Sequence, residues 1–183
     1  PPEERGKRLV AAMGGSKKVV AEAKRAMKAG DYRWSSDLLH QLVFADPKNA
    51  EARALLEGAK APVLLLGQGC FVSRTHAALT ELAALLNCPI LQTNAVEAML
   101  PGMEDRTFPY SSQVGAEVAD SADVVLAIGT ELGEALNYGR GHSWKAGNAN
   151  RKWIYVERDA EAMGINRPID VPLVGDLRDI VPQ

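Results

Sequence analysis

The sequence has few of the residues that form disulfide frameworks and metal centres. Its 183 residues include two cysteines, Cys70 and Cys88, which are too few for a disulfide framework, so we expect a reduced, cytoplasmic protein. The three histidines, His40, His76 and His142, lie far apart and have no carboxylate motif among them. Because a two-metal catalytic site needs clustered ligands, this spacing argues against one.

A long apolar run and a net excess of one charge are also missing. No hydrophobic stretch approaches the roughly 20 residues of a membrane-spanning helix, and the first residues do not have the pattern of a signal peptide. Lysine and arginine number 21 against 23 acidic residues, a net charge of −2. We therefore expect no nucleic-acid or membrane partner, and the cations near the N-terminus are typical of a solvated helix face.

The first third of the sequence has the pattern of short helices separated by tight turns. Capping residues, glycine and proline divide it into four expected helices at residues 1–13, 17–29, 32–45 and 50–60. Gly14 and Gly15 form the first stop, and Val19, Ala23 and Met27 fall on one face of the second helix. Such helices must pack their apolar faces on a neighbour, on a second domain or on another copy.

From about Ala61 onward, apolar strands alternate with helices. Five segments are typical of buried strands, at residues 62–67, 89–93, 123–129, 152–157 and 171–175. Helices are expected at 73–87 and 117–122, and a loop containing a short helix at 94–115. This alternation predicts an α/β fold with a parallel β-sheet and helices on both faces.

Residues 23–56, AKRAMKAGDYRWSSDLLHQLVFADPKNAEARALL, have the small residues, turn and stop of a tetratricopeptide-type helical hairpin. More specifically, about residues 1–58 resemble part of the dimerisation domain of the metallo-β-lactamase-type alkylsulfatases. The resemblance implies TPR-like antiparallel helices and a homodimer formed through them. The His-x-His-x-Asp-His zinc cluster of that family has no counterpart in this sequence, so sulfatase activity is not expected.

A second resemblance covers residues 61–183 and runs through APVLLLGQG, ADVVLAIGTELGE and GINRPIDVPLVGD. This part is similar to the central domain of thiamine-diphosphate-dependent enzymes of the acetolactate synthase and benzoylformate decarboxylase group. The resemblance implies a Rossmann-like sheet of six strands and no thiamine chemistry, because the family binds its cofactor between two flanking domains. Gly175-Asp176 is followed by Leu177 rather than glycine, so it matches the end of the central domain and not the magnesium motif.

The two resemblances divide the chain into a helical dimerisation-type region, residues 1–60, and a Rossmann-like domain, residues 61–183. Both families place a helix at the junction, so the join falls within one helix at about residues 50–60. Natural fusions more often keep whole domains and a loose linker. We therefore interpret the chain as an engineered chimera, a non-catalytic scaffold that self-associates through its helices and is not an enzyme.

The glycine-rich turn Gly67-Gln68-Gly69 is the candidate binding site, because such a turn after a first strand can present backbone N–H groups to a phosphate. No cofactor is required by the scaffold hypothesis, but the resemblance allows ADP or FAD. The residues expected at such a site are Gly67, Gln68, Gly69, Thr93, Asn94, Gly129, Thr130, Glu157 and Asp176. The alternative is that the glycines only permit a tight turn, since Val72 replaces the third glycine of the dinucleotide fingerprint.

Overall fold

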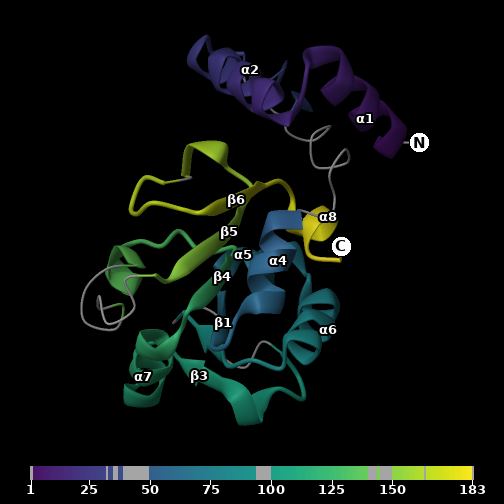
Figure 1. Ribbon diagram of the computed structural model, residues 1–183. Coiled ribbons are helices and arrows are strands. Elements are labelled where there is room, and N and C mark those ends of the chain that lie inside the picture. The colour runs from purple at the N-terminus through teal and green to yellow at the C-terminus, as the bar shows by residue number, and fades with distance from the viewer. Residues whose placement is uncertain are drawn as a thin grey trace. The chain divides into compact units, whose positions relative to one another are not determined.

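The computed structural model describes residues 2–31, 33–34, 37–38, 50–93, 100–139, 144, 150–162 and 164–182. Contacts divide the chain into two compact units, residues 1–49 and residues 50–182 (Figure 1). The junction helix predicted from the sequence therefore groups with the second unit, although the two resemblances placed the boundary after residue 60.

The first unit contains two described helices that contact each other, α1 (Pro2–Met13) and α2 (Ser16–Lys28). Gly14 and Gly15 separate them with φ values of +80° and +112°, which confirms the predicted stop, because side chains disfavour this region. Val19, Ala23 and Ala26 bury one face of α2. Most of the expected helix at 32–45 lies outside the described residues, and so does much of the TPR-like hairpin.

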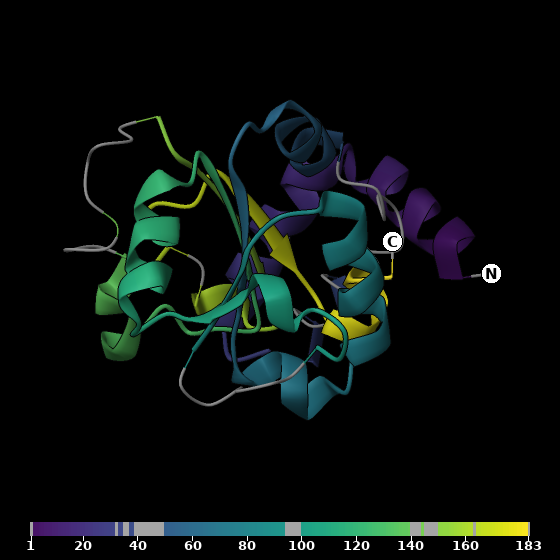
Figure 2. The same cartoon turned by 90° about the horizontal axis from the view of Figure 1, so that it is seen from below.

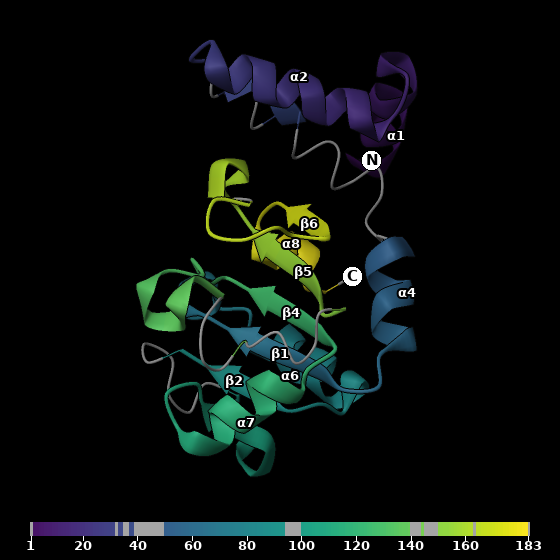
Figure 3. The same ribbon diagram turned by 60° about the vertical axis from the view of Figure 1, so that its left-hand side comes forward.

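The second unit is built on a parallel sheet of six strands, which confirms the predicted fold class. The strand order is β3-β2-β1-β4-β5-β6. The strands are β1 (Pro62–Leu66), β2 (Ile90–Gln92), β3 (Thr107–Pro109), β4 (Val124–Ile128), β5 (Lys152–Glu157) and β6 (Val171–Val174). Leu64 of β1 lies opposite Ile90 and Leu126 in the two neighbouring strands. Each strand pairs in parallel with its neighbours, as Figure 3 shows for β1, β4 and β5, so the C-terminal ends of the strands share one edge.

Helices cover both faces of the sheet (Figures 1 and 2). One face packs against α4 (Ala50–Gly58), α5 (Gln68–Ser73), α6 (His76–Leu86) and α8 (Leu177–Ile180), and the other against α7 (Gln113–Ser121). Short 3₁₀ turns lie at Glu104–Arg106, Glu134–Gly139 and Ala160–Ala162. Because successive side chains of β1 point to opposite faces, Leu64 joins one apolar cluster and Leu65 the other.

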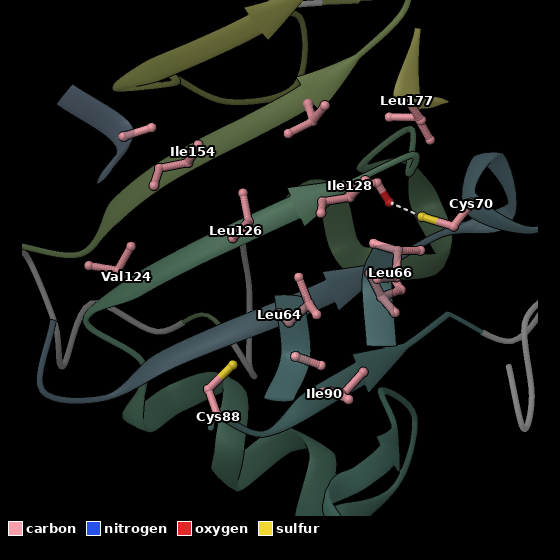
Figure 4. Close-up of a cluster of buried hydrophobic side chains, with 14 of the residues drawn as sticks. Leu64, Leu66, Cys70, Cys88, Ile90, Val124, Leu126, Ile128, Ile154 and Leu177 are labelled. Atoms are coloured by element: carbon pink, nitrogen blue, oxygen red, sulfur yellow. Dashed lines mark hydrogen bonds between the residues drawn. The ribbon is translucent and has the colours of Figure 1, made fainter. Parts of the chain in front are cut away.

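The core on the first face explains why α4 belongs to the second unit. Leu64, Leu66, Ile90, Leu126 and Ile128 gather there from three adjacent strands (Figure 4). The buried side chain of Ala52 joins this cluster, and the partly buried Leu55 and Leu56 pack against it from α4. The helix at the junction is therefore a structural part of the Rossmann-like unit.

Three local expectations need correction. The helix expected at 73–87 begins later, at His76, because Arg74 adopts a left-handed conformation (φ 56°) and ends α5, a separate helix that precedes α6. Strand β3 was not predicted, since it is short and lies at the sheet edge. Helix α7 begins earlier than residue 117, because the Ser112 hydroxyl accepts a hydrogen bond from the Gly115 N–H and caps it.

Candidate functional site

The predicted binding residues lie at the C-terminal edge of the sheet. Gly67, Gln68 and Gly69 follow β1, Thr93 follows β2, Gly129 and Thr130 follow β4, Glu157 ends β5, and Asp176 follows β6. Asn94 lies outside the described residues. After β1 the chain continues to β2 on one side of the sheet, and after β4 it continues to β5 on the other side. The C-terminal ends of β1 and β4 therefore form the topological switch point, where ligands bind in open α/β sheets.

The loops after β1 and β4 contact each other closely at this point. The Gly67 N–H donates to the Ile128 carbonyl at 3.0 Å, and the Gly69 N–H donates to the Gly129 carbonyl at 2.8 Å. A Cβ atom on Gly67 would lie 2.3 Å from the Gly129 oxygen, and Gly129 itself has a φ of +59°. The glycines therefore permit a close approach of two backbones, and both N–H groups are used inside the fold.

The turn continues into α5, which has six residues. The Cys70 N–H donates to the Gly67 carbonyl at 3.1 Å, and its thiol donates to the Ile128 carbonyl at 3.2 Å (Figure 4). Burial raises the pKa of the Cys70 thiol to about 12. This sulfur is therefore neutral at pH 7, and its position is that of a packed core atom rather than a nucleophile.

The neighbouring ends of β4 and β5 are acidic. The Tyr155 hydroxyl donates to the Thr130 carbonyl at 2.5 Å. Burial first, and then the nearby carboxylates of Glu157 and Glu131, raise the pKa of Tyr155 above its ordinary value. The Glu157 carboxylate accepts from the Arg158 N–H at 2.7 Å, which holds it at the edge. This local negative charge disfavours a phosphate group.

Asp176 is also engaged within the fold. Its carboxylate accepts from the Arg178 N–H at 2.9 Å, capping α8, and forms an ion pair with the Arg178 guanidinium at 2.7 Å. The bond from the Arg178 side chain lowers the pKa of Asp176 to about 2, against a smaller opposing effect of burial. Asp176 is therefore not free to bind magnesium, and Gly175, Asp176 and Leu177 do not fit the magnesium motif of thiamine diphosphate enzymes.

Sequence reasoning missed two residues at this edge, Gln92 and Tyr155. Gln92 ends β2 and is 3% exposed, and its side-chain Nε2 has no hydrogen-bond partner among the described residues. A polar residue at the end of an otherwise apolar strand was the available signal. Tyr155 lies within an apolar strand, where nothing in the sequence marks it. Its hydroxyl donates to the carbonyl of Thr130, which is distant in sequence.

The described part of the chain contains no group of three or more His, Cys, Asp or Glu residues that could hold a metal ion. Within it, no helix is long and apolar enough to cross a membrane. Of the histidines, His76 is described and contacts the Phe71 ring edge-on, while His40 and His142 lie outside the described residues.

The strand order and the glycine turn at the switch point define a Rossmann-like α/β domain. The family model for the thiamine pyrophosphate enzyme central domain matches residues 49–183, and the chain belongs to this family. The alkyl sulfatase dimerisation model matches residues 1–62. The chain thus has the two-part composition that the sequence indicated.

Individual relatives agree with both matches. The chain is 54% identical over 55 residues to the (R)-specific secondary-alkylsulfatase of a Pseudomonas species, covering 30% of this chain and 8% of the relative. It is 31% identical over 133 residues to oxalyl-CoA decarboxylase of Escherichia coli K12, covering 72% and 22%. Sulfoacetaldehyde acetyltransferase of Roseovarius nubinhibens is 33% identical over 141 residues, covering 71% and 22%. The chain thus spans less than a quarter of each relative.

A solved structure supports the fold. The structure, described as a thiamin diphosphate-dependent enzyme from Mycobacterium smegmatis, matches with a TM-score of 0.57 and 20% identity. The match covers 72% of this chain and 25% of that one.

Proposed function

We propose that the chain is a non-catalytic fusion in which a helical association module is joined to a folded Rossmann-like scaffold. The observation that supports this most directly is the overlap of the two family matches over residues 49–62. This overlap contains α4, which packs into the core of the second unit. One helix thus lies within both family matches and completes the core of the scaffold.

The chemistry at the sheet edge favours a scaffold over an enzyme. Two groups that could act as nucleophile or acid, Cys70 and Tyr155, have raised pKa values and donate hydrogen bonds to backbone carbonyls. The carboxylate of Asp176 is held in an ion pair with Arg178. None of these groups is poised to exchange a proton near pH 7.

Self-association is expected through the first unit, because a unit of residues 1–49 is short and can bury only a limited core. Its buried apolar residues, in the part that is described, are Val19, Ala23, Ala26 and Leu38. A core of this size rarely stabilises a unit below about 70 residues, and oligomerisation is a common solution. Trp34 is 42% exposed and offers further apolar surface for a partner. A two-fold dimer is the commonest closed assembly.

Light scattering after size exclusion at high salt tests this proposal. The full chain is expected to have the mass of a dimer, and a truncated chain that begins at Ala50 the mass of a monomer. A monomeric full chain at all concentrations would contradict self-association through the helices.

A nucleotide-binding module for ADP or FAD is the second candidate. Two observations favour it: the switch-point position, and the buried Gln92 Nε2, which has no partner among the described residues and is a donor suited to a ligand oxygen. The occupied N–H groups of Gly67 and Gly69 and the acidic ends of β4 and β5 argue against it. The described residues do not form a phosphate cradle.

Thermal melts with ADP, FAD, NAD, coenzyme A and thiamine diphosphate separate the two candidates. A ligand at about 100 times its dissociation constant adds about 2.7 kcal/mol to the stability of the native state. At this chain length, each kcal/mol raises Tm by about 2–4 °C. We expect no shift with any of them, and a selective shift with one adenine nucleotide would support the module instead.

We infer further that the two parts were joined by design. The support is that the matches to two unrelated families overlap over residues 49–62, which contain α4, instead of being separated by unmatched residues. Amplification across the junction from genomic DNA provides the test. A continuous natural reading frame that encodes both parts would contradict a designed join, but it would leave the scaffold proposal unchanged.

A further inference from the structure

One exposed face of α2 is strongly basic. Lys17, Lys18, Lys24, Arg25 and Lys28 are all exposed, and their spacing places them on one side of the helix. We call this set the basic stripe. Val19, Ala23 and Ala26 bury the opposite side, so the stripe faces away from the core of the first unit. We propose that the basic stripe binds the acidic edge of a second copy of this chain.

Most charges of the stripe have no partner in the described residues. The exception is Arg25, which donates two hydrogen bonds to Glu22 at 2.6 and 2.8 Å. Both partners lie on the surface, so this pair contributes little stability. Helix α1 adds the exposed cations Arg5, Lys7 and Arg8. The exposed cations of α1 and α2 therefore outnumber the single acidic partner, Glu22, that binds one of them.

The second unit has the opposite charge. Residues 1–49 contain ten basic and six acidic residues, a net charge of +4, whereas residues 50–183 contain 11 basic and 17 acidic residues, a net charge of −6. The near-neutral net charge of the chain is therefore the sum of a positive first unit and a negative second unit. Complementary charge on one chain favours a contact between unlike surfaces of two copies.

The acidic edge consists of Glu131, Glu157, Asp159 and Glu161, at the C-terminal ends of β4 and β5. Glu131 follows Thr130, whose carbonyl accepts from the Tyr155 hydroxyl at 2.5 Å, and Glu157 ends the adjacent strand β5. The Glu157 carboxylate accepts from the Asp159 N–H at 3.3 Å, so the three acidic residues lie at one edge. Asp159 accepts from the Glu161 N–H at 2.8 Å and is thereby held in the same turn. Glu131, Asp159 and Glu161 are exposed, and Arg158 is the cation among them. The edge remains negative after this cation is counted.

This contact differs from the proposed dimer in surface, symmetry and salt dependence. A stripe that binds an edge is a head-to-tail contact, which adds further copies unless a ring closes. The Debye length falls from about 30 Å at 0.01 M salt to about 3 Å at 1 M, so the contact should dissociate at high salt. An apolar dimer should persist there, so either proposal can fail alone.

The test measures mass by light scattering against concentration at both salt levels. We expect the mass at low salt to rise with concentration beyond that of the assembly present at high salt. A mass that is the same at both salt levels would overturn the head-to-tail contact, whether the chain is then a monomer or a dimer.

Charge reversal identifies the surfaces. The stripe variant Lys17→Glu/Lys24→Glu/Lys28→Glu and the edge variant Glu131→Lys/Asp159→Lys should each lose the rise in mass at low salt, and combining all five reversals in one chain should restore it. The control Lys60→Glu/Arg74→Glu, which changes exposed cations of the second unit, should keep the rise. Circular dichroism checks that each variant folds.

Two further outcomes would overturn the proposal. One is a combined variant that folds but stays unassociated at low salt. The other is a stripe variant that keeps the rise in mass yet loses binding to duplex DNA, because the stripe would then be a polyanion surface. Fluorescence anisotropy of labelled duplex DNA at low salt provides that measurement.

Discussion

At the scale of single residues, the tightest constraint lies where the loops after β1 and β4 touch. We predict that Gly67→Ala destabilises the second unit, because the added Cβ would lie 2.3 Å from the Gly129 oxygen and 2.5 Å from Thr130 Cα. Overpacking of this kind costs about 1–3 kcal/mol. Gly58→Ala is the matched control, because no atom lies within 4 Å of its added Cβ. Urea unfolding followed by tryptophan fluorescence measures both, and equal stabilities would contradict the prediction.

The carboxylate of Asp123 fixes the start of β1 in a pH-dependent way. It accepts from the Lys60 N–H at 2.7 Å and the Ala61 N–H at 3.0 Å. Burial raises the pKa of Asp123, but these backbone hydrogen bonds outweigh burial and hold the pKa below 3.8. Because the folded pKa is lowered, the carboxylate stabilises the fold above pH 3.8, and this contribution is lost as the pH falls through the folded pKa.

Asp123→Asn should therefore cost about 1–3 kcal/mol near neutral pH, since hydrogen bonds to a charged acceptor are lost. The difference from the parent chain should shrink as the pH falls below 3.8. Asp105→Asn, at an exposed position, should change stability by less than about 0.5 kcal/mol. Urea unfolding across the pH range measures this, and a gap that widens on acidification would refute the assignment.

At the scale of elements, α4 decides where the folding unit begins. A truncated chain that begins at Ala50 should unfold cooperatively, whereas one that begins at Ala61 should be much less stable. Removing α4 uncovers the core cluster that Ala52, Leu55 and Leu56 pack against. Burial of a leucine side chain contributes about 1.5–3 kcal/mol when complete, and partial burial contributes less. Urea unfolding of the two truncated chains compares them, and equal stability would place the boundary after α4.

Most elements followed from local patterns in the sequence. The five apolar segments became strands because a strand covered on both faces is apolar throughout, as β1 and β4 are. Strand β3 was not predicted, because its three residues, which end in Pro109, are too few to show the alternation of apolar and polar side chains that indicates a strand. The break at Arg74 was missed because nothing around it is typical of a helix end, although its conformation is left-handed.

The candidate site was predictable in position but not in its contacts. The glycine turn and the strand ends give the location, since the C-terminal ends of parallel strands share one edge. That Gly69 donates to Gly129 depends on two loops about sixty residues apart, which no local pattern encodes. The same holds for Tyr155 and Thr130. The sequence alone therefore allowed two interpretations of the glycines, a tight turn or a phosphate site. The long-range hydrogen bonds favour the tight turn, because they occupy the N–H groups that a phosphate would need.

At the scale of the whole molecule, the two units differ in how they gain stability. The second unit buries large side chains on both faces of its sheet, including Trp153 and Tyr155. The first unit buries small residues such as Ala23 and Ala26 along α2. On the proposed association of the first unit, mass action would stabilise its helices and not the sheet, so protein concentration should affect the two units differently.

We predict two unfolding transitions. In a Trp34→Phe variant, the remaining tryptophans, Trp144 and Trp153, both belong to the second unit, so fluorescence reports on the sheet alone. Circular dichroism at 222 nm follows all helices. The dichroism signal should begin to fall at a lower temperature than the fluorescence signal, and only this early phase should move upward as protein concentration rises, because mass action stabilises an associated state. Coincident transitions that do not change with concentration would mean that the first unit is stable on its own or unfolds together with the sheet.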